Sequence, residues 1–145
     1  MPPAQAPAVA LVTGAARRIG QQIAVALARD GYDVVVHYAG SRAAALATVA
    51  QIEAMGRRAC AIGRDLSVER AARALLAECA ERLGEVTCLV NNASLFEADT
   101  ARSFSARRLE RHMRLNLVAP VILARQLHER VPDGGEAVVI NLLDQ

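Results

Sequence analysis

The sequence lacks lysine and tryptophan altogether, and it holds only two tyrosines and two phenylalanines in 145 residues. Its 17 basic residues are therefore all arginines, set against 15 acidic residues, and the formal net charge is +2. So small a charge, with aromatic residues at 3%, provides neither the basic surface nor the stacking platform that nucleic-acid binding needs. We therefore expect no nucleic-acid partner, and we interpret the arginine-only usage, beside abundant alanine, as a compositional bias.

Cysteine is scarce, and its spacing excludes two kinds of site. Cys60, Cys79 and Cys88 lie in separate apolar stretches and form no Cys-x-x-Cys or Cys/His cluster. This pattern predicts free thiols in a reducing compartment rather than a disulfide framework or a metal site. No apolar run approaches the roughly 18 residues of a membrane-spanning helix, and the opening MPPAQAPA lacks the basic residue of a signal peptide. We expect a cytoplasmic protein with no membrane partner and no bound metal.

What the sequence does contain is a regular alternation of β-branched apolar runs with helical periodicity. The apolar runs predict strands at 8–14, 33–38, 57–65, 86–93 and 136–143, and the periodic segments predict helices at 17–31, 41–56, 67–84 and 106–131. Strands that are apolar on both faces and alternate with helices indicate an α/β fold, a doubly wound parallel sheet of the Rossmann type. Crossover rules favour strand order 3-2-1-4-5. We expect one domain over 8–145, preceded by a disordered Pro/Ala-rich tail at 1–7.

The segment LVTGAARRIG, residues 11–20, joins the first strand to the first helix. Gly14 allows a sharp turn and Gly20 allows the helix to pack close to the sheet, while the free N–H groups of the helix start favour a pyrophosphate. Arg17 and Arg18 stand within this turn, where glycine is the easier choice for backbone that approaches a ligand. Because it follows a strand and precedes a helix, the turn predicts a dinucleotide site at the carboxyl ends of the strands.

The end of the second strand indicates which dinucleotide binds. An NAD site places Asp or Glu there, but this sequence reads HYAGSR, and Asp33 lies at the opposite end of the strand. Ser41 and Arg42, with Arg17 in the first turn, instead suit the 2′-phosphate of NADP(H). The alternative is that Arg42 is only a solvated residue of the first helical turn.

Taken together, TGAARRIG, RDLS, VNNAS, the helix that carries Asn116 and the strand VVINLLD resemble the short-chain dehydrogenase/reductase family. The spacing stays in register from residue 8 to the last residue. Two positions depart from the usual pattern, because Arg18 and Ser94 stand where the family usually has glycine. With HYAGS and Phe96, these departures resemble the pteridine reductase branch, which includes bacterial dihydropteridine reductases.

The resemblance implies a set of cofactor contacts along one edge of the sheet. They are Gly14, Arg17, Arg18, Ile19, Gly20, His37, Tyr38, Ser41, Arg42, Asp65, Leu66, Asn91, Asn92, Ala93 and Ser94. Within this set, Asp65 is expected to meet the adenine amino group and Leu66 to supply a backbone contact. From the residues alone, Asp65 could equally cap a helix or form a turn, and two adjacent asparagines could be turn formers.

The resemblance also implies three substrate contacts. Arg18 is expected to contact both the cofactor phosphate and a pterin, giving up a flexible glycine for a fixed fork of donors. Ser94 is expected to hydrogen-bond the cofactor or the pterin, and Phe96 to stack on the pterin opposite the nicotinamide. The alternative for Phe96 is an ordinary apolar anchor of its loop.

Two further residues are expected to take part in catalysis. Asn116 interrupts an apolar helical stripe, where a buried amide needs partners, and Pro120 cannot donate to its carbonyl. The resemblance implies that Asn116 holds a proton-relay water there, and the alternative is a simple proline kink. Asp144 stands where most of the family has a catalytic serine, and the pteridine reductase branch uses an aspartate there to help a tyrosine deliver a proton.

The family's Tyr-x-x-x-Lys pair is missing, since there is no lysine and the tyrosines are Tyr32 and Tyr38. We therefore expect this chain to be the N-terminal part of a reductase, without strands six and seven, and inactive alone. Intact relatives form tetramers, so a homo-oligomer is expected. The leading hypothesis is NADPH-dependent hydride transfer to a dihydropterin or dihydrofolate. The alternatives are a carbonyl or 3-oxoacyl-thioester reductase of the same family and a non-catalytic NADPH-binding or regulatory module.

Overall fold

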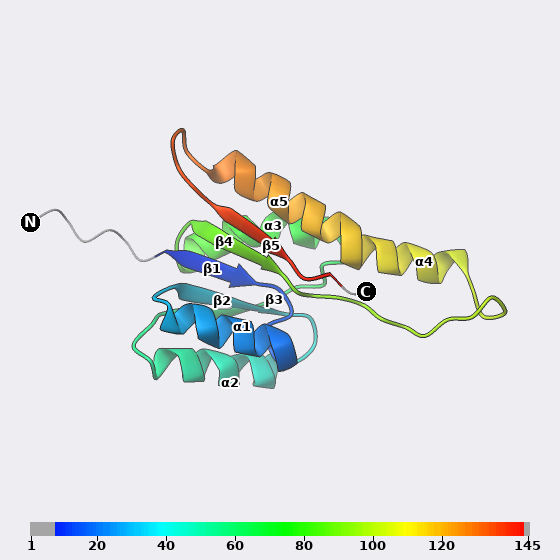
Figure 1. Ribbon diagram of the computed structural model, residues 1–145, viewed down its shortest axis with the longest axis horizontal. Coiled ribbons are helices and arrows are strands. Elements are labelled where there is room, and N and C mark those ends of the chain that lie inside the picture. Colours follow the sequence, from blue (N-terminus) through cyan, green and yellow to red (C-terminus); the bar gives the residue numbers. More distant parts are fainter. Residues whose placement is uncertain (1–7, 144–145) are drawn as a thin grey trace, which may run out of the picture.

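The computed structural model describes residues 8–143 and shows one parallel sheet between two layers of helices (Figure 1). The strands are β1 (Val9–Val12), β2 (Asp33–Tyr38), β3 (Ala59–Gly63), β4 (Val86–Asn91) and β5 (Val138–Asn141). Each hydrogen-bonded pair runs parallel, and the order β3-β2-β1-β4-β5 confirms the predicted 3-2-1-4-5 arrangement. Each strand lies within its predicted segment, and the tail expected at 1–7 falls outside the described residues.

Two separate hydrophobic cores lie on opposite faces of the sheet. α1 (Arg18–Arg29) and α2 (Arg42–Glu53) cover one face, and α3 (Glu69–Arg82) and α5 (Ala119–Arg130) cover the other. Successive strand residues point to opposite faces, so Val12 packs with α1 and α2, whereas its neighbour Leu11 packs with α3 and α5. Burial on both faces explains why the strands show no polar alternation. It leaves the loops at the carboxyl ends of the strands as the place for a ligand.

The helix expected at 106–131 is not a continuous α-helix, which corrects the sequence prediction. α4 (Ala106–Met113) passes into a π-helical turn, η1 (Arg114–Val118), before α5 begins. The N–H of Ala119 donates to the carbonyl five residues earlier rather than four. Pro120 follows and has no N–H to donate to the carbonyl of Asn116, four residues earlier. One hydrogen bond of a regular α-helix is therefore missing where the π-helical turn forms.

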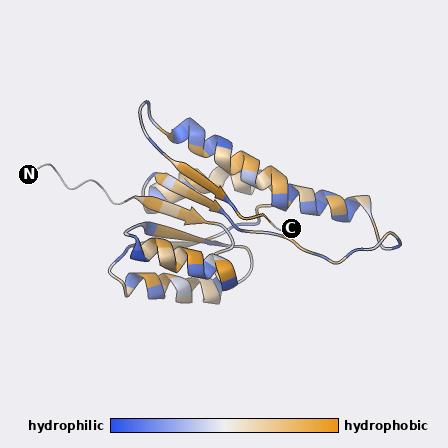
Figure 2. Cartoon of the chain, viewed as in Figure 1, coloured by the Kyte–Doolittle hydropathy of each residue, from blue (hydrophilic) through white to orange (hydrophobic). Residues whose placement is uncertain are grey.

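Apolar residues are frequent in β5 and recur along α4, η1 and α5 (Figure 2), and several of their side chains are exposed. They include Leu109, Met113, Leu117, Val121, Val138 and Ile140. β5 also stands at the edge of the described sheet and pairs only with β4. An apolar edge with unpaired backbone groups favours contact with further protein surface.

Asp33 is buried at the end of β2 that lies away from the first turn. Its carboxylate accepts hydrogen bonds from Arg57 Nη2 at 2.8 Å, from Arg58 Nε at 2.7 Å and from the Arg58 backbone N–H at 3.0 Å. Burial raises the pKa of the Asp33 carboxyl, but the hydrogen bonds and charges of Arg58 and Arg57 outweigh it and hold this pKa below its ordinary value. Asp33 therefore ties the start of β2 to the segment that leads into β3.

Replacing Asp33 by asparagine should lower the free energy of unfolding by about 2 kcal/mol at neutral pH, because two arginines lose their buried carboxylate. A carboxyl with a lowered pKa stabilises the folded state above its unfolded pKa of about 4, and this contribution is lost as the pH falls through the folded pKa. Urea denaturation at neutral pH and at about pH 3 should therefore show a gap between native and variant protein that narrows in acid. The exposed Asp30→Asn change is the matched control. A gap of unchanged size in acid would contradict this assignment.

Candidate functional site

The turn between β1 and α1 has left-handed backbone at two places. Gly14 has a φ of 63°, which glycine adopts without strain, whereas Arg18 has a φ of 54°. Among the described residues, Arg18 is the one non-glycine residue with a positive φ. Such a conformation costs an L-residue about 1 kcal/mol. The arginine therefore occupies a position that suits glycine better on backbone grounds alone.

Gly20, in the first turn of α1, brings the helix against the turn. A Cβ at this position would overlap the carbonyl oxygen of Gly14 and the side-chain nitrogen of Asn92. Neither neighbour is the free end of a flexible side chain, because Asn92 is itself held by hydrogen bonds. Glycine is therefore required here by packing, as the sequence predicted from its place in the turn.

Thr13 and Asn92 fasten the first turn to the end of β4. Thr13 Oγ1 accepts hydrogen bonds from the backbone N–H groups of Asn92 and Ala93, both at 2.9 Å. Asn92 Nδ2 donates to the carbonyl oxygens of Thr13 at 2.9 Å and Gly14 at 3.1 Å. Thr13 was not predicted as a site residue, although a polar residue that ends an apolar strand and precedes the turn glycine was an available signal. The Asn92 side chain thus holds the backbone of the turn in place at Thr13 and Gly14.

The turn borders a cleft of about 390 Å³, here named the turn cleft, at the carboxyl ends of β1 to β4. Its lining residues are Gly14, Arg17, Arg18, Ile19, Gly20, His37, Ala39, Asp65, Leu66, Asn92, Ala93, Ser94 and Leu115. Most of the predicted cofactor residues meet in this cleft, although they come from four separate segments of the chain. The predicted residues that do not line it are Tyr38, Ser41, Arg42 and Asn91.

The first three of these residues lie beyond the turn cleft, at the end of β2 and the start of α2. The Tyr38 ring packs over Gly63, where an added Cβ would meet it. Ser41 makes no side-chain capping hydrogen bond to α2, and the first turn of that helix contains no acidic residue. Arg42 is exposed as the first helical residue. The start of α2 therefore presents a hydroxyl and a cation next to the backbone N–H groups of a helix terminus.

Asp65 follows β3 and is exposed at the turn cleft. Its Oδ1 accepts hydrogen bonds from the Ser67 backbone N–H at 2.9 Å and from the Ser67 hydroxyl at 2.7 Å. This is the turn role that the sequence analysis kept open for Asp65, and it leaves Oδ2 without a hydrogen bond to the described residues. Leu66 is buried beside it.

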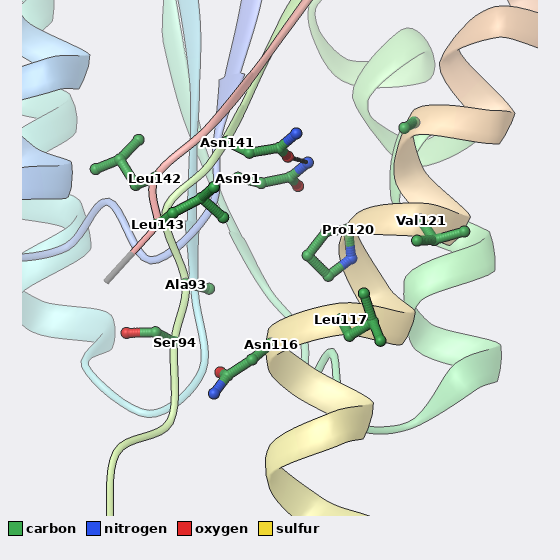
Figure 3. A pocket seen from close by; sticks show the side chains of 11 residues that line it. Asn91, Ala93, Ser94, Asn116, Leu117, Pro120, Val121, Asn141, Leu142 and Leu143 are labelled. Carbon is green, nitrogen blue, oxygen red and sulfur yellow. Dashed lines mark hydrogen bonds between the residues drawn. The ribbon is translucent and has the colours of Figure 1, made fainter. Parts of the chain in front are cut away.

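A second cleft of about 450 Å³, here named the α5 cleft, lies between the ends of β4 and β5 and the η1–α5 segment (Figure 3). Its lining residues are Asn91, Ala93, Ser94, Asn116, Leu117, Pro120, Val121, Ala124, Asn141, Leu142 and Leu143. Asn91 Nδ2 donates to Asn141 Oδ1 at 2.8 Å and ties the two strands. Ala93 and Ser94 line both clefts, so the two spaces meet at this segment.

Asn116 is exposed, so the expectation of a buried amide is wrong. Its side chain instead hydrogen-bonds to both backbone groups of one residue, Leu95, in the loop after β4. Asn116 Oδ1 accepts from the Leu95 backbone N–H at 2.8 Å, and Asn116 Nδ2 donates to the Leu95 carbonyl at 2.9 Å. Asn116 needs no burial to satisfy its amide, because both hydrogen bonds go to the backbone of the residue after Ser94, and Figure 3 shows Asn116 beside that segment. Its amide holds the loop between the two clefts, and its role in a proton relay stays a prediction.

Phe96 lies outside both clefts. Its side chain is 83% exposed and lines a third cavity with Phe104, Arg108 and His112. The structure therefore brings Arg18 and Ser94 to one cleft but does not bring Phe96 to it. Asp144, the other expected catalytic residue, lies outside the described residues.

Membrane spans and metal sites are two further features that the described residues can reveal. Over residues 8–143, none of the helices has both the length and the apolar character for a membrane crossing. Over the same residues, His, Cys, Asp and Glu side chains form no group of three that could hold a metal ion.

Comparison with known proteins decides which family this arrangement represents. The model of the short chain dehydrogenase family matches residues 8–143. The chain belongs to this family. Versicolorin reductase 1 of Aspergillus parasiticus is 37% identical over 131 residues, which are 90% of this chain and 50% of that protein. The 3-oxoacyl-[acyl-carrier-protein] reductase FabG of Staphylococcus aureus is 43% identical over 86 residues, 59% of this chain and 35% of that protein.

Among solved structures of short-chain dehydrogenases, the chain is similar to FolM alternative dihydrofolate reductase 1 of Brucella suis in complex with NADP. The TM-score is 0.89 at 35% identity, over 94% of this chain and 57% of that one. This similarity agrees with the resemblance to the pteridine reductase branch. The chain spans about half the length of versicolorin reductase 1 and of the FolM structure, and its match to FabG covers 35% of that protein.

Proposed function

We propose that this chain forms the NADP(H)-binding part of a short-chain oxidoreductase that reduces dihydropterin or dihydrofolate-type substrates. The observation that carries the proposal is Arg18, which keeps a left-handed backbone at the edge of the turn cleft. A residue held in an unfavourable conformation at a cleft indicates a function for its side chain. A guanidinium fork suits phosphate oxygens and the polar edge of a pterin.

The residues of the turn cleft fit a dinucleotide phosphate. Gly14 and Gly20 keep Cβ atoms out of the turn, and the N-cap position Arg17 forms no side-chain cap on α1. The first turn of α1 has no acidic residue, so its N–H groups and positive dipole face the cleft together with Arg17 and Arg18. The 2′-phosphate of the cofactor would lie beyond the turn cleft, at Ser41 and Arg42 near the start of α2. The NADP in the Brucella FolM structure supports this choice of cofactor.

The α5 cleft supports a substrate position next to the cofactor. When bound, NADPH supplies a hydride. Ser94 lines both clefts, where its hydroxyl is placed to donate or accept a hydrogen bond with a bound molecule, while Arg18 lines the turn cleft and contributes its charge. Asn116 holds this junction in place through Leu95. Stacking by Phe96 requires its ring to turn toward Ser94, two residues earlier in the same segment.

Turnover assays on the natural polypeptide that carries this sequence test the proposal. NADPH oxidation should follow addition of a dihydropterin or dihydrofolate, and it should be much slower with an acetoacetyl thioester. The segment shared with FabG favours the thioester as a second candidate, and activity with the thioester alone would replace the pterin assignment. Tight NADPH binding without turnover of either substrate class would favour the non-catalytic module.

A homo-oligomer stays part of the proposal. The exposed apolar residues of α4, η1 and α5 form a surface that a second copy of a short-chain dehydrogenase could cover. Size-exclusion chromatography with light scattering measures the assembly directly. A monomer at micromolar concentration would contradict this part alone.

Replacing Arg18 by glycine should hold or raise the free energy of unfolding by up to about 1 kcal/mol, because left-handed backbone suits glycine. NADPH affinity should fall about 10-fold, because a charged donor is lost. Chemical denaturation and fluorescence titration of NADPH measure the two effects. The control for the stability effect is Arg17→Gly, since Arg17 is extended with a φ of −150° and its replacement relieves no strain. Unchanged affinity in the Arg18 variant would remove the main support for the proposed site.

A further inference from the structure

His37 is a buried polar residue near the carboxyl end of β2, with only 1% of its surface exposed. Its Nδ1 lies 3.1 Å from the Gly14 backbone nitrogen, and its Nε2 lies 2.9 Å from the Arg64 carbonyl oxygen. The ring thus spans from the first turn to the segment after β3. Its own carbonyl accepts a further bond from the Ala15 N–H at 2.8 Å.

These two partners determine which ring nitrogen carries the proton. The Gly14 N–H can only donate, so Nδ1 must accept and must be unprotonated. The Arg64 carbonyl can only accept, so Nε2 must donate and must carry the hydrogen. Both bonds form only with the neutral Nε2–H tautomer. An imidazolium would place two N–H groups face to face at Gly14.

The Gly14 peptide groups are consequently fixed from two sides. His37 accepts from its N–H, and Asn92 donates to its carbonyl at 3.1 Å. Gly14 has left-handed backbone and begins the turn that leads to α1, so these bonds set the direction in which α1 begins. A turn that is shaped before the ligand arrives binds it with less ordering cost.

We propose that His37 is a positioning residue of the phosphate-binding turn, competent only as the neutral Nε2–H tautomer, so that protonating it weakens NADP(H) binding. The inference rests on the proposed cofactor site. It gives His37 a role that acts through Gly14, since both ring nitrogens are occupied by backbone partners and neither is available to the ligand.

The surroundings agree with a neutral ring. Burial lowers the pKa of His37, while the hydrogen bond to the Arg64 carbonyl and the charge of Asp65 raise it, and the net direction is downward. Arg17 and Arg18 line the same cleft from the turn side. A histidine with a lowered pKa stabilises the folded state above its unfolded pKa of about 6.5, and that contribution is lost as the pH falls below this value.

Two substitutions test the hydrogen bonds of the two ring nitrogens separately. In His37→Asn the amide oxygen stands near the place of Nδ1 and can still accept from Gly14. In His37→Gln the longer amide reaches toward Arg64 but leaves the Gly14 N–H without its acceptor. NADPH titrations of the natural polypeptide should show about a 10-fold loss of affinity for His37→Gln and rescue of most of it in His37→Asn. The ratio of native to His37→Asn dissociation constants should rise in acid, where only the native ring gains a proton, and ionisation of the cofactor cancels in this ratio.

If His37→Asn and His37→Gln lost NADPH affinity equally, and in proportion to their loss of thermal stability, the proposal would be overturned and His37 would be a purely structural residue.

Nitrogen NMR of the native histidine ring is an independent test that needs no variant. It should show a protonated Nε2 and an unprotonated Nδ1 at neutral pH, and the opposite tautomer or an imidazolium would overturn the proposal. Failure of the native protein to bind NADPH would instead contradict the proposed cofactor site, whatever tautomer the ring adopts.

Discussion

Replacing Gly20 by alanine should weaken NADPH binding by about 100-fold or more, the largest effect expected from one methyl group in this chain. The added Cβ would overlap the Gly14 carbonyl and the Asn92 side chain, and both are parts of the hydrogen-bonded turn. To make room, α1 must move away from the turn and take its N-terminal N–H groups with it. Calorimetric titration of NADPH measures the loss.

The control for this experiment is Gly31→Ala. Gly31 has a φ of 99° and nothing within 4 Å of an added Cβ, and it lies at the far end of α1. Alanine there costs stability through backbone strain of about 1 kcal/mol but leaves the turn cleft unchanged. If both variants lost affinity alike, the loss would follow from general destabilisation, and the packing role of Gly20 would be wrong.

Replacing Arg42 by alanine should weaken NADPH binding by about 10- to 100-fold and NADH binding by less than about 3-fold. The 2′-phosphate is the chemical difference between the two cofactors, and Ser41 and Arg42 at the start of α2 are its proposed partners. The Ser41 hydroxyl makes no capping hydrogen bond to α2, and the first turn of this helix has no acidic residue. Both features support a contact with the 2′-phosphate. Parallel titrations of both cofactors give the two ratios.

Arg70→Ala is a suitable control, because Arg70 is an exposed arginine near the start of another helix, α3. It should change neither affinity. Equal loss of NADPH and NADH binding in the Arg42 variant would show that Arg42 is not a reader of the 2′-phosphate. It would then be the solvated helical residue that the sequence analysis kept as its alternative.

Much of the fold was predictable from local patterns, for identifiable reasons. Val9 to Val12 and Val34 to Val36 are apolar at successive positions, which is typical of a strand covered on both faces, and their alternation with helical segments indicates a parallel sheet with helices on each side. The π-helical turn was not predictable in the same way. Pro120 indicated that one helical hydrogen bond is missing, but a kinked α-helix and a π-helical turn are both consistent with that loss.

The residues of the candidate site were also predictable only in part. Gly14 and Gly20 were predicted because a turn between a strand and a helix has strict backbone requirements, whereas the role of Arg18 was predicted from the resemblance to the pteridine reductase branch. Residues that act by holding others were harder to assign: Thr13 was missed, and Asn116 was expected to be buried but clamps Leu95 from an exposed position. Their roles depend on contacts between segments far apart in the chain, which no local pattern records. His37 is intermediate, since a histidine inside a valine strand is unusual but its two partners are not visible in the sequence.

The measurement that tests the cofactor assignment most directly is the pair of dissociation constants for NADPH and NADH, determined by calorimetry on the natural polypeptide that carries this sequence. The arginines of the first turn and of α2, with no acidic residue at the end of β2, predict that NADPH binds at least about 10-fold more tightly. Equal affinity, or a preference for NADH, would contradict the assignment of Ser41 and Arg42 and with it the proposed NADPH-dependent reductase.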